Sequence, residues 1–182
     1  MAKMDESIKR IEFVFRNSVS QDELFDAFRE AIVLRINDVA LYKILLANPA
    51  LNKDEIKMYT EKLLKEIPGS TFQLCMWTAK VFENHAEDYE QLEHAIVYYT
   101  KACYHNPESH EPYLDLVKLY NTDMELPSNK KILQIIETGT SSVIYKSKVY
   151  FALSDLFKKM NDLNNASKYL ALAAKAAERE KE

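Results

Sequence analysis

The stretch that decides the fold is residues 150–177, which read YFALSDLFKKMNDLNNASKYLALAAKAA. Its bulky and small side chains recur at helical spacing, and a polar turn at Asn161-Asp162 divides it into two segments. The pattern positions are Tyr150, Leu153, Ser154, Phe157, Ala166, Leu170 and Ala173. Alanine allows two helices to approach closely, and aromatic side chains fill the space beside such a contact. The stretch therefore predicts a helical hairpin that is closest at Ala166 and Ala173.

Parts of the same pattern recur upstream. One copy of its second half is formed by Ala95, Tyr99, Ala102 and Pro107. Ile132 occupies an equivalent position between the two copies, so that successive units begin about 37 and 34 positions apart. A period in the mid-thirties, built from helix–turn–helix units, is typical of an α-solenoid.

Apolar stripes and helix-end signals predict about ten helices and no strand. The expected helices cover approximately 5–17, 20–36, 38–48, 52–67, 71–85, 91–105, 112–120, 129–139, 142–160 and 163 to the end. Ser20 with Glu23 has the pattern of a capping box. Gly139 is compatible with a left-handed C-cap or with close packing, and its place after an apolar stripe favours the C-cap.

The composition excludes several classes of protein. Only two glycines occur in 182 residues, which argues against a hairpin-rich β-protein and a phosphate-binding loop. The net charge is −4 with both signs interspersed, so nucleic acid is not expected as a partner. Two distant cysteines form no disulfide framework, and neither a signal peptide nor a membrane-spanning run is visible. We expect a cytoplasmic protein without membrane association.

On these residues the chain resembles the tetratricopeptide repeat family. Residues 150–173 match the family's spacing without insertion, and Trp77 and Tyr113 fit the first-half aromatic position of two further units. The resemblance implies an all-α fold: an α-solenoid of about five antiparallel helix pairs in a right-handed superhelix. A single domain is expected, with capping helices at 1–37, repeat-like hairpins at 38–177 and a charged tail at 178–182.

The resemblance also implies a concave groove lined by the first helix of each pair. Positions beside the packing residues are expected to face it. The candidates are Thr78, Phe82, Leu114, Lys118, Phe151 and Asp155. Three of these are apolar, which favours a hydrophobic ligand segment; the alternative, weighted equally, is that they contact neighbouring helices of the chain.

Candidate catalytic and metal-binding residues are few. Cys103, His105 and His110 lie close in sequence, but a zinc site normally requires a fourth ligand, and we expect no metal or cofactor. His85 and His94 flank a run of acidic residues that is typical of a solvated turn. A cysteine–histidine nucleophile lacks a local signature, and Ser154 fits a packing position, so no catalytic residue is predicted.

The leading functional hypothesis is a non-enzymatic scaffold or adaptor that binds a peptide or a partner helix in its groove, including a chaperone-like role. A second hypothesis is an enzyme, or a binder of small molecules or metals, that uses histidine and cysteine in the groove. A third is a structural subunit that assembles with itself. The chain is expected to be a monomer or a weak homo-oligomer, and the sequence does not identify its partner.

Overall fold

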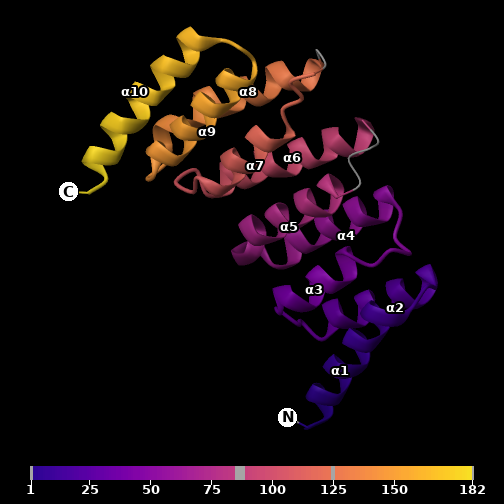
Figure 1. Cartoon of the computed structure of the whole chain (residues 1–182). Helices are drawn as coiled ribbons and strands as arrows, with labels where there is room; N and C mark the ends of the chain where they lie inside the picture. Colours follow the sequence, from indigo (N-terminus) through magenta and orange to yellow (C-terminus); the bar gives the residue numbers. More distant parts are fainter. Residues whose placement is uncertain (1, 85–88, 124–125, 182) are drawn as a thin grey trace. The chain divides into compact units, whose positions relative to one another are not determined.

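The computed structural model describes residues 2–84, 89–123 and 126–181. Within these ranges the chain forms ten α-helices and two short 3-10 helices, and no residue is in a strand (Figure 1). This confirms the predicted all-α class. The chain divides into two compact units, Met1–Asn84 and His85–Glu182, each described here on its own, and the predicted single domain stays a prediction.

The first unit contains five α-helices connected by short loops. They are α1 (Ala2–Asn17), α2 (Gln21–Val33), α3 (Val39–Leu46), α4 (Lys53–Glu66) and α5 (Thr71–Glu83), with a 3-10 turn at Pro68–Ser70 before α5. Helix α1 packs against α2 and α3, and α5 packs against α3 and α4. Asn52 and Glu55 form a complete capping box at the start of α4, which explains why this helix begins where the sequence predicts.

Two polar contacts bind helices of this unit together, one from the buried side chain of Asn48 and one from the half-buried side chain of Trp77. Asn48 donates hydrogen bonds to the carbonyl oxygens of Phe15 (2.9 Å) and Ser18 (3.1 Å), which would otherwise lack partners at the end of α1. The indole of Trp77 donates to the Lys43 carbonyl at 2.9 Å, so α5 is bound to α3. Each contact joins segments about thirty residues apart in sequence and fixes how α1, α3 and α5 pack.

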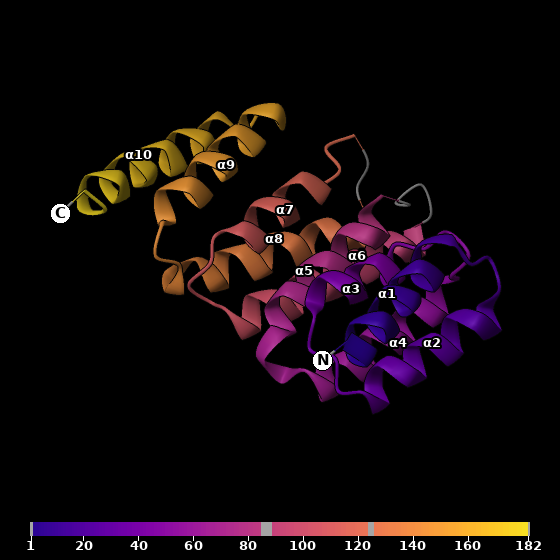
Figure 2. The ribbon, with the colours of Figure 1, turned by 90° about the horizontal axis from the view of Figure 1, so that it is seen from below.

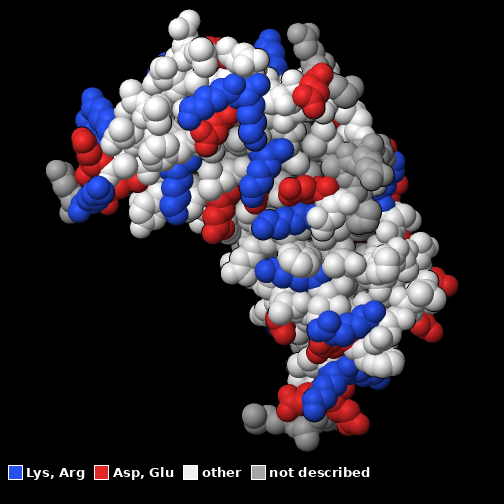
Figure 3. Space-filling model, viewed as in Figure 1, with Lys and Arg blue, Asp and Glu red and all other residues white. Residues whose placement is uncertain are grey.

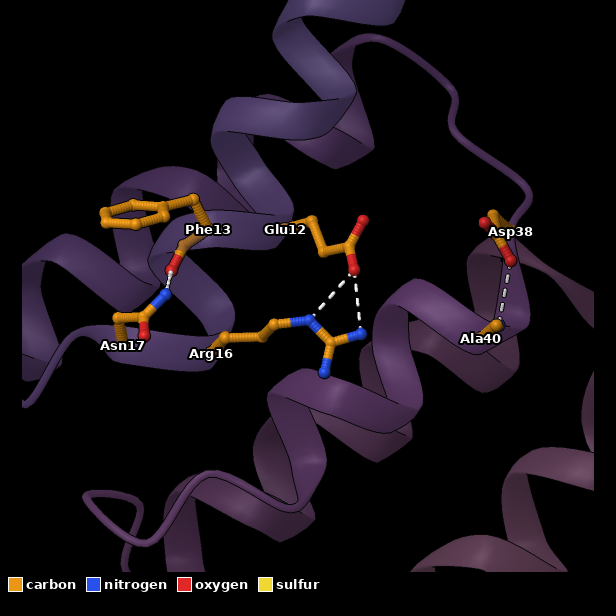
Figure 4. A network of polar contacts seen from close by, with 6 residues as sticks. All are labelled: Glu12, Phe13, Arg16, Asn17, Asp38 and Ala40. Atoms are coloured by element: carbon orange, nitrogen blue, oxygen red, sulfur yellow. Dashed lines mark hydrogen bonds and ion pairs between the residues drawn. The ribbon is translucent and has the colours of Figure 1, made fainter.

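The polar side chains around α1 and the start of α3 make contacts with residues close to them in sequence (Figure 4). Arg16 donates from Nε and Nη2 to Oε1 of Glu12, at 2.9 and 2.8 Å, one helical turn away. Asn17 donates to the Phe13 carbonyl at 2.8 Å, and Asp38 accepts from the Ala40 amide at the start of α3. Contacts of this kind stabilise helix ends without making a binding site.

The described residues of the second unit also form five α-helices. They are α6 (Tyr89–His105), α7 (Glu111–Leu119), α8 (Pro127–Gly139), α9 (Lys146–Lys159) and α10 (Leu163–Arg179), with a 3-10 turn at Thr140–Ser142. Helix α7 packs against α6, α8 and α9. Helices α9 and α10 lie side by side along their length (Figure 2).

The hairpin of α9 and α10 has the contact that the sequence predicts. Ala166 and Ala173 are buried, with 3% and 0% of their surface exposed. Ser154 is also buried, and its Oγ donates to the Ala166 carbonyl at 2.9 Å. The rings of Phe157 and Tyr169 stack at 5.4 Å beside this contact. Small side chains therefore mark the interface, although Leu170, which belongs to the same pattern, is 44% exposed.

The end of α2 differs from the prediction. The helix stops at Val33 rather than near Ile36, because Arg35 has a φ of 53° and reverses the chain. The Ile36 amide then donates back to the Ala31 carbonyl at 3.1 Å, as in a Schellman motif. The apolar stripe in the sequence extends beyond the end of α2 because Ile36, which follows the turn, is also buried.

Gly139 also differs from the prediction. Its φ is −82°, so it is not a left-handed C-cap. A Cβ atom added there would lie 2.7 Å from Cζ of the Tyr113 ring, well inside van der Waals contact. The glycine is therefore a close-packing site, where α8 meets the buried Tyr113 of α7.

Helix α8 begins at Pro127, which the sequence placed in a loop, and α9 begins at Lys146 rather than near Ser142. Proline is well suited to the first turn of a helix, where its missing N–H has no partner to lose. None of the helices among the described residues has both the length and the apolar character needed to cross a lipid bilayer.

Candidate functional site

A cleft of about 330 Å³ lies between α7 and α9; we call it the α7–α9 cleft. It is lined from α7 and the segment after it by Leu114, Val117, Lys118, Tyr120 and Thr122, and from α9 by Ala152, Asp155, Leu156 and Lys159. The helix spacing of these residues explains their convergence, since positions three and four apart lie on one face. Of the six groove residues predicted from sequence, Leu114, Lys118 and Asp155 come together here.

The charged side chains of this cleft are exposed, whereas Leu156 is buried and Leu114 is half-buried. Lys118 makes an ion pair with Asp115 at 2.5 Å, and Lys158 makes one with Asp155 at 3.0 Å. Mixed charges of this kind occur over both units on the face that Figure 3 shows. The α7–α9 cleft thus combines apolar walls with charges of both signs, which suits a peptide or helix more than a single compact ion.

The other three predicted groove residues do not line this cleft. Thr78 and Phe82 of α5 are fully buried, and the Thr78 hydroxyl lies 3.0 Å from that of Thr60. Both are therefore core residues that do not face a groove, and for Phe82 this is the alternative of contacts with neighbouring helices. Phe151 lies on α9 with 43% of its surface exposed, but it is not part of the cleft.

A larger cavity, of about 700 Å³, lies where the start of α9 meets the last turns of α10; we call it the α9–α10 cavity. Three basic side chains line it: Lys146, Lys175 and Arg179. Its apolar and aromatic lining includes Ile144, Tyr145, Tyr150 and Leu172. The only acidic residue among those that line it is Glu180, whose carboxylate accepts from the Ser147 amide at 2.9 Å and from the Ser147 hydroxyl.

Tyr145, which lines the α9–α10 cavity, makes further cationic and aromatic contacts. The ammonium group of Lys148 lies 5.2 Å from the centre of the Tyr145 ring and 3.1 Å from Nε2 of His110. The His110 ring in turn contacts Tyr145 edge-on at 5.8 Å. Sequence reasoning missed this site because it joins residues 142–150 to residues 172–180. The one signal in the sequence was the charged tail at 178–182, which contains Arg179 and Glu180.

The first unit has an apolar surface that is partly exposed. Phe25, Val33 and Met58 are 45%, 75% and 46% exposed, and they surround a hollow of about 340 Å³ between α2 and α4. Phe28 and Ile32 line the same hollow. The apolar stripe of α2 follows helical spacing, but part of it is not covered by α1 or α4 and remains exposed.

The described cysteine and histidine candidates differ in burial and in contacts. Burial raises the pKa of the Cys103 thiol to about 12, and its contact with the Tyr113 hydroxyl only partly opposes this, so the thiol is protonated and a poor nucleophile at neutral pH. His105 is exposed, and His94 lies 3.7 Å from Glu90. His85 lies outside the described residues. Among the residues described, no three histidine, cysteine or acidic side chains are grouped closely enough to hold a metal ion.

Comparison with known proteins found no matching family model, no matching curated protein and no matching solved structure.

Proposed function

We propose that this chain is a protein-interaction module that holds a peptide or a partner helix in the α7–α9 cleft. The observation that carries the proposal is the convergence of Leu114, Lys118 and Asp155 on one cleft between the first helices of two successive hairpins. The sequence predicts that all three positions face a groove. The cleft volume of about 330 Å³ suits a few side chains of a bound segment.

The physical character of the cleft favours an amphipathic segment. Leu114, Val117 and Leu156 provide apolar surface, while Lys118 and Asp155 offer opposite charges beside it. Burial of apolar side chains supplies affinity, and exposed charges of both signs fix the orientation of the partner more than they add binding energy. A helix with one apolar face, or an extended segment with alternate apolar residues, meets both requirements.

The wider architecture that we propose is a tetratricopeptide-like α-solenoid. The order of helix hairpins, with contacts mainly between neighbouring helices in each unit, supports this arrangement. Small-angle scattering tests it, because a compact domain of this length has a radius of gyration of about 16 Å. We expect a clearly larger value for a stack of hairpins, and a value at or below that of a compact domain would contradict the solenoid.

The partner-binding role is tested with a cleft variant and a matched control. Leu114→Glu introduces a carboxylate into the apolar wall, whereas Leu163→Glu makes the same change at a position that is 69% exposed on α10. Captured proteins are compared by quantitative mass spectrometry, after circular dichroism shows that both variants are folded. We expect at least one protein to be retained by the wild type and by Leu163→Glu but lost with Leu114→Glu. Equal capture by all three would refute the role of the cleft.

A further inference from the structure

The α9–α10 cavity has the charge of an anion-binding site. Among the described residues, Lys146, Lys175 and Arg179 form no ion pair or hydrogen bond through their side chains, although all three line this one cavity. The carboxylate of Glu180, which also lines it, is already bound by Ser147 at the start of α9. The cavity is therefore positive in a chain whose net charge is −4.

The positions of the cations on α10 define the spacing of a ligand. Lys175 and Arg179 are four residues apart, which corresponds to about 6 Å along a helix axis. In an extended peptide, alternate side chains point to the same side and lie about 6.8 Å apart. Two carboxylates in alternate positions of an extended peptide thus match the two cations of α10.

The apolar part of the cavity adds a second requirement. Leu172 lies on α10 nearly one turn before Lys175 and is 36% exposed, and Ile144 is 57% exposed. Both line the same cavity as the cations, so a ligand that fills it covers apolar surface in addition to charge. A small inorganic ion would leave these side chains in water.

We propose that the α9–α10 cavity binds an extended acidic peptide segment of another protein, in which an apolar residue precedes two acidic residues in alternate positions. Lys175 and Arg179 pair with the two carboxylates, Lys146 adds positive charge, and Leu172 and Ile144 contact the apolar residue. This site is separate from the α7–α9 cleft and does not depend on the function proposed for it.

The test uses the full chain and the peptide Leu-Ser-Glu-Ser-Glu-Ser-amide, which carries an uncharged fluorophore on its N-terminus and no carboxylate at its blocked C-terminus. The control peptide has glutamine in place of both glutamates. We expect saturable binding by fluorescence anisotropy for the glutamate peptide alone, weakening as salt is added because exposed charge pairs are screened. Equal binding of the glutamine peptide, or no binding of either, would overturn the proposal.

Variants locate the binding. Lys175→Gln together with Arg179→Gln should weaken the glutamate peptide about tenfold, since two exposed charge pairs are lost. Lys168→Gln removes the same kind of charge from α10 outside the cavity and should leave the affinity for the glutamate peptide unchanged. Wild-type affinity in the double variant would contradict the site. Inorganic phosphate and a single-stranded oligonucleotide are tested as the other possible anions. Binding of either one, without binding of the glutamate peptide, would also contradict the proposal.

Discussion

Two hairpins of the second unit bring their helices together by different means. In the α9–α10 hairpin, Ala166 and Ala173 repeat along one face of α10, and the contact extends along both helices. In the α7–α8 hairpin, one glycine at the end of α8 lies under the Tyr113 ring of α7. The comparison shows that a small residue marks a close contact in both cases. Such a contact can be predicted from the sequence only when small residues recur at helical spacing.

The largest effect is expected from Gly139→Leu. A single added carbon already meets the Tyr113 ring, and that ring is 2% exposed with little room to move. We expect a loss of about 3 kcal/mol in the free energy of unfolding, at the upper end of overpacking effects. Urea denaturation followed by circular dichroism measures it.

A double-mutant cycle with Tyr113→Ala sharpens this test. If the ring is the obstacle, the combined variant should be less destabilised than the sum of the two single variants. Additive losses would mean that Gly139 is required for another reason, and the contrast between the two hairpins would fail.

A smaller effect is expected from Ala166→Leu in the other hairpin. Its three added carbons must fit between α9 and α10, where Ser154 donates to the Ala166 carbonyl. Because the extended contact can redistribute strain along both helices, we expect a loss of about 2 kcal/mol in the free energy of unfolding. Leu170→Ala, at a position of α10 that is 44% exposed, serves as the control and should change stability little. An unchanged thermal midpoint for Ala166→Leu would refute the assigned packing.

Much of the helix order could be predicted because its determinants are local. Asn52 with Glu55, and the prolines at 49, 68 and 107, start or stop helices through contacts within a few residues. Gly139 was misread because the ring that explains it is 26 positions away in the chain. Phe25 lies on the apolar stripe of α2 and is nevertheless 45% exposed, because periodicity identifies an apolar face but not whether another helix covers it.

The candidate sites also differ in whether local spacing in the sequence was enough to predict them. Leu114, Lys118 and Asp155 were found because each lies beside packing residues on its own helix, so a rule of local spacing was sufficient. The same rule failed for Thr78 and Phe82, which are buried in the core. The α9–α10 cavity could not be predicted, since it forms only when the segment before α9 meets the end of α10.

The reversals after α2 and α9 have a consequence for the unfolded chain. Arg35 and Asn161 hold backbone conformations, with φ of 53° and 57°, in which glycine is the usual residue. A side chain at these positions restricts the backbone of the unfolded chain far more than glycine would. Less conformational entropy is therefore lost when each turn forms. The rarity of glycine thus stiffens the chain before any helix docks, at the expense of some local steric strain at two corners.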